Sequence, residues 1–143
     1  MQGSWLETIN MKNIHASGKR KMAIARATLT QGTGIVRINN MPVDLVEPKI
    51  SRLKIKEPLI LAEDFANKVN INVNVVGGGM TSQAEASRLA IAKALVSFSK
   101  SDKLKQAFLD YDRNLLVADV RRKEAAKPNR HGQARAKVQK SYR

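Results

Sequence analysis

The residues of this sequence best suited to do chemistry are the arginines and lysines of its last 25 positions. Residues 119–143 hold nine Lys or Arg and two acids, so this tail carries a net charge of +7 out of the formal +14 of the 143-residue chain. Small residues separate the cations, which lets an extended chain follow a phosphate groove. A chain this basic is matched to a polyanion, with nucleic acid ahead of a membrane surface.

Two further features of the tail bear on its partner. Beyond Val120 the only large aliphatic residue is Val138, so the tail cannot bury enough apolar surface to offset its ordering entropy. We therefore expect an arm that is extended or disordered until it meets its partner. The ring of Tyr142 is able to stack on a base or a ribose. The alternative interpretation is a tail that serves only solubility or localisation.

Few residues outside the tail have the types and spacing of a catalytic site. Asp110 and Asp112 are candidates for a carboxylate pair, but two residues apart on a helix they would not share a face. His15 and His131 have no Ser or carboxylate partner at a recognisable spacing. The absence of cysteine excludes disulfides, thiolate nucleophiles and cysteine-ligated zinc. We expect no enzyme activity and no cofactor or metal; a ribonuclease using the two aspartates is the alternative, and general DNA or membrane binding ranks third.

The glycine run and the cations of the first strands are weaker candidates for anion contact. Gly77-Gly78-Gly79 precedes a predicted helix, where backbone amides attract phosphate. No Gly-Lys-Ser/Thr follows, which excludes a nucleotide-binding P-loop, and a tight strand-to-helix turn is the favoured interpretation. Gly18-Lys19-Arg20-Lys21 is either a solvated face or a phosphate contact. Arg26 and Arg37 fall on predicted strands, where they project from a sheet face toward RNA or lie at an edge.

Periodicity predicts that these groups are carried by a compact α/β domain. Hydrophobic residues make up 43% of the chain and aromatic residues 4%, so its core must be mostly aliphatic. Alternation predicts a strand over 23–30, a turn at 31–34, a return strand over 35–38 and a turn at 39–40. Pro48 is placed to open a short helix as its first residue, and Pro58 to interrupt or restart it.

The second half of the domain has the more regular patterns. Residues 69–76 alternate, with Val and Ile facing one way and Asn70, Asn72 and Asn74 facing solvent or RNA. In the next helix, Ser82 and Glu85 have capping-box spacing, and one apolar face is formed by Ser87, Ala90, Ile91, Ala94, Leu95 and Phe98. A further helix capped by Ser101, with Leu104, Ala107 and Phe108 inside, precedes a last strand over 115–120. No apolar run reaches the length of a membrane span.

Several segments together resemble the family of small-subunit ribosomal protein nine. The sequence Gly-Gly-Gly-Met-Thr-Ser-Gln-Ala-Glu-Ala at 77–86, continued by Ala-Ile-Ala-Lys-Ala-Leu at 90–95, is similar to the family signature. Residues 18–27 resemble its first strand, and 115–124 its last strand and the start of its tail. Ala134-Arg135-Ala136-Lys137 and residues 139–143 resemble its terminus. The Ser-Tyr-Arg ending is similar to archaeal and eukaryotic members.

The resemblance, which covers roughly residues 17–143, implies both a fold and a function. The fold is an α/β (α+β) sandwich, a mixed sheet packed by helices, similar to the second domain of small-subunit ribosomal protein five, with an extended basic C-terminal tail. The implied role is a structural, cytoplasmic constituent of the small-subunit head. Its partners would be small-subunit ribosomal RNA, neighbouring head proteins and the anticodon stem-loop of the peptidyl-site tRNA. The tRNA contact would fall to Lys140, Tyr142 and Arg143.

The expected domains are an N-terminal extension over 1–17, a globular RNA-binding domain over 18–118 and the tail over 119–143. Residues 1–10 have no recognised counterpart, and Met11-Lys12 is a natural start. Val120 stands where close members have Pro, and residues 129–132 are less basic than in many family tails. The cations assigned to ribosomal RNA are Lys19, Arg20, Lys21, Arg26, Arg37, Arg121, Arg122, Lys123, Lys127, Arg130, Arg135 and Lys137.

Overall fold

Five strands form one mixed sheet on which the rest of the fold is built. A computed structural model describes residues 13–129 and 132–135. The strands are β1 (Ile14–Arg20), β2 (Ala23–Gln31), β3 (Val36–Ile38), β4 (Met41–Pro42) and β5 (Val69–Val76). They lie in the order β1-β2-β5-β3-β4, with β3 parallel to β5 and the other neighbouring pairs antiparallel.

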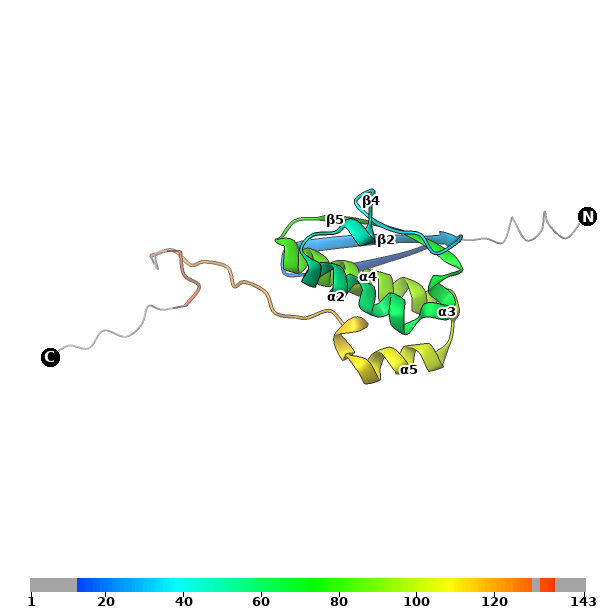
Figure 1. Ribbon diagram of the computed structural model, residues 1–143. Coiled ribbons are helices and arrows are strands. Elements are labelled where there is room, and N and C mark those ends of the chain that lie inside the picture. The colour runs from blue at the N-terminus through cyan, green and yellow to red at the C-terminus, as the bar shows by residue number, and fades with distance from the viewer. Residues whose placement is uncertain (1–12, 130–131, 136–143) are drawn as a thin grey trace, which may run out of the picture.

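The long helices lie on one face of this sheet in two layers (Figure 1). α2 (Lys49–Leu61) and α4 (Met80–Ser99) pack next to the strands, and α5 (Asp102–Tyr111) lies beyond them. The short elements are the 3-10 helix η1 (Val43–Leu45), α3 (Glu63–Ala66) and the 3-10 helix η2 (Arg113–Leu115). After η2 the described part of the chain runs away from the body without regular secondary structure.

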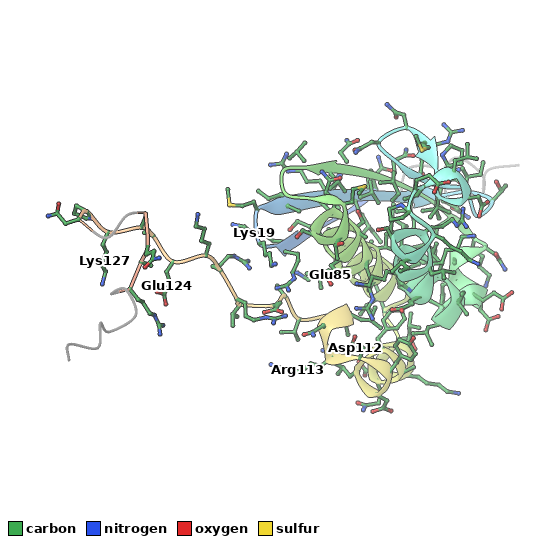
Figure 2. The ribbon with its side chains drawn as sticks, turned by 60° about the vertical axis from the view of Figure 1, so that its left-hand side comes forward. Lys19, Glu85, Asp112, Arg113, Glu124 and Lys127 are labelled. Atoms are coloured by element: carbon green, nitrogen blue, oxygen red, sulfur yellow. The ribbon has the colours of Figure 1, made fainter. Side chains whose placement is uncertain are left out.

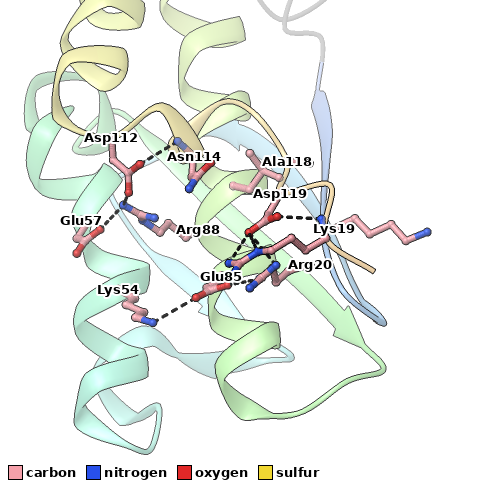
Figure 3. A pocket seen from close by; sticks show the side chains of 12 residues that line it. Lys19, Arg20, Lys54, Glu57, Glu85, Arg88, Asp112, Asn114, Ala118 and Asp119 are labelled. Carbon is pink, nitrogen blue, oxygen red and sulfur yellow. Dashed lines mark hydrogen bonds and ion pairs between the residues drawn. The ribbon is translucent and has the colours of Figure 1, made fainter. Parts of the chain in front are cut away.

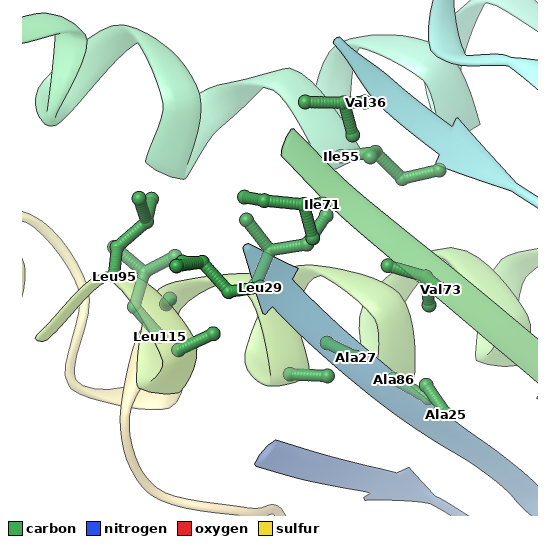
Figure 4. Packing of buried hydrophobic residues seen from close by; sticks show 14 of the residues in the cluster. Ala25, Ala27, Leu29, Val36, Ile55, Ile71, Val73, Ala86, Leu95 and Leu115 are labelled. Atoms are coloured by element: carbon green, nitrogen blue, oxygen red, sulfur yellow. The ribbon is translucent and has the colours of Figure 1, made fainter. Parts of the chain in front are cut away.

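Small side chains allow α4 to lie close to the sheet. Ala25 and Ala27 of β2 are at most 1% exposed, and they face a helix whose Ala86 and Ala90 are fully buried (Figure 4). Gly18 of β1 touches the same helix, because a Cβ added there would lie 2.2 Å from the backbone oxygen of Ala86. The core is mostly aliphatic, as the composition predicts, with Phe108 as its fully buried aromatic residue, and its closest contact depends on residues with little or no side chain.

The expected α/β class, with a mixed sheet packed by helices, is confirmed. On β5 the side chains of Val69, Ile71, Val73 and Val75 are 0–5% exposed, and Asn72 and Asn74 are exposed on the opposite face. The turn at Asn39-Asn40 is also confirmed, since both residues have positive φ and connect β3 to β4. Ser101 caps α5 as expected, its hydroxyl accepting a hydrogen bond from the backbone N–H of Leu104.

The predicted pairing of the first strands is wrong in two respects. Residues 14–31 form a hairpin that turns at Lys21-Met22, so residues 14–17, expected in an extension, belong to the sheet. The segment 35–38 does not return along β2, because β5 lies between them and β3 pairs with β5 in parallel. Residues 31–34 are therefore a crossover loop. Its course depends on β5, which comes later in the sequence.

Three predicted helix signals do not act as expected. The N-cap of α4 is Gly79, without a side-chain cap, so Ser82 and Glu85 do not form a capping box. Instead, Glu85 binds cations from other elements. Pro58 does not interrupt α2, because it lies in the last turn and is buried in the core. Pro48 precedes the helix as its N-cap instead of being its first residue.

The strand predicted over 115–120 is also absent. Leu115 is fully buried, as an apolar strand residue would be, but it reaches the core from η2. Asp112 caps that turn by accepting a hydrogen bond from the backbone N–H of Asn114 at 2.9 Å. Val120 is 88% exposed. The apolar pattern of this segment thus reflects the burial of Leu115. Residues 115–120 pair with no strand among the described residues.

Replacing Gly18 with Ala tests the close contact between β1 and α4. The added methyl group meets backbone atoms of Ala86 and Ala90, which cannot rotate away, so we expect Gly18→Ala to lower the free energy of unfolding by about 2 kcal/mol or more. Gly79→Ala is the matched control, because nothing lies within 4 Å of its Cβ position; it should cost less than about 1 kcal/mol. Urea unfolding measures both variants, and equal losses would contradict the contact.

Candidate nucleic-acid interface

The face of the sheet turned away from the helices carries cations and no acids. Arg26 on β2 and Arg37 on β3 are exposed, as is Lys19 on β1. The five strands contain no Asp or Glu at all, so every acid of the body lies on a helix or a loop. Among the described residues, no element covers this face and neither Arg26 nor Arg37 pairs with an acid. We call it the open sheet face.

Strand register arranges the polar groups of the open sheet face into rows. One row runs from Ser17 through Arg26 to Asn74. The next row runs across four strands, through His15, Thr28, Asn72 and Arg37. Cross-strand partners project from the same face, so two guanidinium groups flank a pair of asparagine amides. Such groups donate to phosphate oxygens and also exchange hydrogen bonds with base edges and ribose hydroxyls.

Not every polar group on this face is free to bind. The side-chain oxygen of Asn70 accepts hydrogen bonds from the backbone N–H groups of Thr33 and Ile35, at 3.0 and 3.1 Å, and holds the crossover loop. His15 Nδ1 lies 3.3 Å from the hydroxyl of its cross-strand partner Thr28. Asn72 and Asn74 are thus the asparagines left for a ligand, while Asn70 is structural.

The glycine run connects β5 to α4 as a tight turn, the interpretation favoured from the sequence. Gly77 and Gly78 have φ of 78° and 66°, values that glycine adopts without strain. A Cβ on Gly77 would lie 2.5 Å from the backbone oxygen of Met22. The side-chain amide of Gln83 closes the turn by donating to the oxygen of Gly77 at 3.0 Å. The glycines therefore let the turn pass close to the β1–β2 hairpin.

A cluster of ion pairs joins the end of β1 to the start of the tail (Figure 3). Arg20 donates from Nε to Oε2 of Glu85 at 2.6 Å, and its Nη1 forms an ion pair with Oδ2 of Asp119 at 2.9 Å. Lys54 of α2 reaches the other oxygen of Glu85 at 3.3 Å. The Arg20 side chain is only 12% exposed. Arg20, predicted to contact RNA, is thus engaged with two acids of its own chain.

Arg88 of α4 repeats this arrangement a turn away. Its Nη2 lies 2.6 Å from Oε2 of Glu57 on α2 and donates to Oδ2 of Asp112 at 3.0 Å. Both clusters border a cavity of about 290 Å³ between α2, α4 and the segment that follows η2. Each buried arginine therefore binds one acid from a helix of the body and one from the C-terminal segment.

Glu85, Asp112 and Asp119 remain ionised because their partners outweigh burial. Burial disfavours the carboxylate of Glu85, but hydrogen bonds from Arg20 and Lys54 lower its pKa overall. Burial likewise opposes ionisation of Asp112, and the N–H of Asn114 and the guanidinium of Arg88 lower its pKa. Hydrogen bonds from the side chain and backbone of Arg121 lower the pKa of Asp119 to about 2. The clusters thus hold fixed charge at neutral pH.

Beyond Asp119 the described part of the tail is mostly exposed, and it pairs with itself at a second place besides the Asp119–Arg121 pair. Arg135 donates to both oxygens of Glu124, at 3.0 and 2.7 Å. The backbone N–H of Lys127 donates to the oxygen of Gln133 at 3.0 Å. These two contacts bring residues 124–127 next to residues 133–135.

The predicted RNA-binding residues fall into four groups. Lys19, Lys21, Arg26 and Arg37 are exposed on or beside the sheet, and Arg20 is in the ion cluster. Arg121, Arg122, Lys123, Lys127 and Arg135 are exposed in the tail. Arg130, Lys137, Lys140, Tyr142 and Arg143 lie outside the described residues, as does His131. Sequence reasoning missed the roles of Glu85, Arg88 and Asp119; the position of Glu85 within the signature was the one available hint.

The candidate catalytic acids have ordinary structural partners. Asp110 accepts a hydrogen bond from the side chain of Gln106 at 2.8 Å, and Asp112 caps η2 and binds Arg88. Within residues 13–129 and 132–135, no group of three His, Asp or Glu side chains is placed to hold a metal ion. In the same residues no helix is both long and apolar enough to cross a membrane.

Comparison with known proteins gives one consistent result. A family model described as ribosomal protein S9/S16 matches residues 18–143. The chain is 48% identical over 134 residues to proteins named "Small ribosomal subunit protein uS9" from Methanococcus vannielii and from Methanococcus maripaludis strains C7 and C5. Each alignment covers 93% of this chain and 100% of the relative. These relatives agree with the archaeal type that the Ser-Tyr-Arg ending indicates.

The ionisation of Asp119 reports mainly on its bonds to Arg121 and less on its pairing with Arg20. The pKa of Asp119 is about 2, below its ordinary value of 3.8. Its interactions therefore stabilise the fold fully above pH 3.8, and this stabilisation is lost as the pH falls toward 2. Arg121→Ala should raise the midpoint more than Arg20→Met, because Arg121 contributes most to the shift. Carboxyl ¹³C NMR titration measures both. An Asp119 midpoint near 3.8 in the unmodified protein would show that these pairs do not form in solution.

Proposed function

The chain belongs to the ribosomal protein S9/S16 family and is a structural constituent of the small ribosomal subunit, and from this premise we propose that it binds ribosomal RNA through its open sheet face and its tail. The last residues of that tail reach the peptidyl-site tRNA. Members of the family are structural and not enzymatic. The alternative of a ribonuclease has no support from Asp112, which is bound to Arg88.

One observation carries the proposal for the body: the strands contain no acid, and their cations other than Arg20 point away from the helices. The partly buried cations Arg20 and Arg88, by contrast, are each matched by two acids. The open sheet face therefore carries positive charge that no acid on the same face offsets. Each phosphate that such a cation neutralises releases counterions, which makes binding favourable and salt-dependent.

The proposal for the tail rests on charge and on the family resemblance. Arg122, Lys123 and Lys127 are exposed and have no acidic partner among the described residues. They are spaced to follow ribosomal RNA away from the body. Lys140, Tyr142 and Arg143 lie outside the described residues, and their assignment to tRNA follows from their position in the family motif. Two cations and a ring suit a contact with phosphates and a base or ribose.

Sedimentation at increasing salt tests the open sheet face. We expect the protein in cell lysate to sediment with the small subunit and Arg26→Ala/Arg37→Ala to dissociate at lower salt. With purified full-length small-subunit ribosomal RNA, the slope of log affinity against log salt should fall by about 2. Lys103→Ala/Lys105→Ala is the matched control, since it removes two exposed lysines from α5, beyond α4. Equal effects of the two double variants would contradict a role for this face.

Removal of Lys140–Arg143 tests the tRNA contact separately. Small subunits carrying the shortened protein should bind tRNA at the peptidyl site roughly ten-fold more weakly, because three donors and a stacking ring are lost. Filter binding measures the affinity. The shortened protein should still resist salt in sedimentation, since the open sheet face is intact. Unchanged tRNA affinity at full occupancy would remove tRNA from the proposed function.

A further inference from the structure

We propose that Arg20, Glu85 and Asp119 form a positioning site that fixes the direction in which the tail leaves the body and so determines how well its last residues engage tRNA. The inference rests on the proposed tRNA contact. None of the three residues needs to touch tRNA. Figure 2 shows the tail leaving the body past Lys19 and Glu85, the region where β1 ends.

Arg20 is suited to be the fixed centre of this site. It is the last residue of β1, whose pairing with β2 runs without interruption from Ile14 to Arg20. Gly18, two residues earlier, is in contact with the backbone of α4. The guanidinium is held by Glu85 at 2.6 Å, and Lys54 braces Glu85 from α2. Three elements of the body therefore hold the group to which Asp119 binds.

Asp119 connects the anchored side chain of Arg20 to the first residues of the tail and so sets the direction of the tail. While Oδ2 pairs with Arg20, Oδ1 accepts a hydrogen bond from the backbone N–H of Arg121 at 2.9 Å. The side chain of Arg121 donates twice to Oδ2, and Arg122 donates to the backbone oxygen of Asp119 at 2.9 Å. The first residues of the tail are thus ordered by the same carboxylate that binds the body.

A second anchor lies a few residues upstream. Leu115 is fully buried, and Asp112 binds Arg88, which also binds Glu57. The segment between Asp112 and Asp119 is therefore held at both ends. This restricts the direction in which the chain continues after Asp119. From Arg121 to Lys140 an extended chain can reach roughly 60 Å at about 3.3 Å per residue. Releasing the start of the tail therefore lets its last residues sample a wider region.

Charge alone makes the opposite prediction. Asp119→Asn removes a negative charge from a protein that binds a polyanion, so simple attraction would strengthen binding to RNA. Loss of positioning would weaken it, because a loosened tail spends less time near its site. The sign of the change therefore separates the two explanations.

The first test uses small subunits purified from cells whose only copy of the protein carries Asp119→Asn. We expect full occupancy of the subunit and peptidyl-site tRNA affinity reduced roughly three- to ten-fold. Asp110→Asn is the matched control; it makes the same chemical change at an exposed acid outside the cluster and should leave the affinity unchanged. Equal or tighter tRNA binding by Asp119→Asn would overturn the proposal, as would loss of the folded variant from the subunit.

Arg20→Lys provides an independent variant that keeps the charge. A lysine cannot bridge two carboxylates as a guanidinium fork does, so we expect a loss of the same size as that of Asp119→Asn. The double variant should be no worse than either single variant, because both disrupt one interaction. Fully additive losses would show that the two residues act separately and would overturn the positioning site.

A distance measurement tests the geometry without any tRNA. The chain has no cysteine, so Lys103→Cys and Ala125→Cys give unique positions for spin labels on α5 and on the tail. In the full-length protein, Asp119→Asn should broaden the label–label distance distribution, and an unchanged distribution would overturn the proposal. If the distribution broadens but removal of Lys140–Arg143 leaves tRNA affinity unchanged, the tRNA contact fails while the anchoring of the tail stands.

Discussion

The close approach of α4 to the hairpin of β1 and β2 is the constraint on which the rest of the structure depends. Only glycine at position 18 and alanines at the facing positions allow that approach. Because the helix lies so near, its solvent-side residues Glu85 and Arg88 come within reach of the strand end and of the C-terminal segment. The close packing of Gly18 and the alanines thus determines where the charged side chains of Glu85 and Arg88 meet their partners.

The distribution of acids explains how a protein with a formal charge of +14 keeps a stable body. Acids on helices and loops neutralise Arg20, Lys54 and Arg88 where these are partly buried, since a buried charge without a partner is costly. The strands have no acids, so the cations of the open sheet face keep their charge, as do Arg122, Lys123 and Lys127 of the tail. The acids therefore stabilise the partly buried cations of the fold, and the cations without acids nearby are available to bind polyanions.

Sequence reasoning succeeded where periodicity is local and failed where distant segments meet. The alternation of β5, the buried face of α4, the cap at Ser101 and the turn at Asn39-Asn40 all follow from neighbouring residues. The insertion of β5 between β2 and β3 depends on a strand some 30 residues later. Glu85 has the spacing of a capping residue, but its partner Arg20 lies 65 positions away. Charge pairs at that separation leave no pattern in a single sequence.

The sharing of each buried arginine between two acids has a consequence for synthesis of the chain. A protein emerges from the ribosome N-terminus first, so Asp112 and Asp119 appear after β1, α2 and α4 are complete. Arg20 already has Glu85, and Arg88 already has Glu57, within the part made earlier. Neither guanidinium is ever buried alone while the body assembles. Asp112 and Asp119 then bind arginines that are already held by Glu85 and Glu57. The basic tail is attached last, to a surface that has already formed.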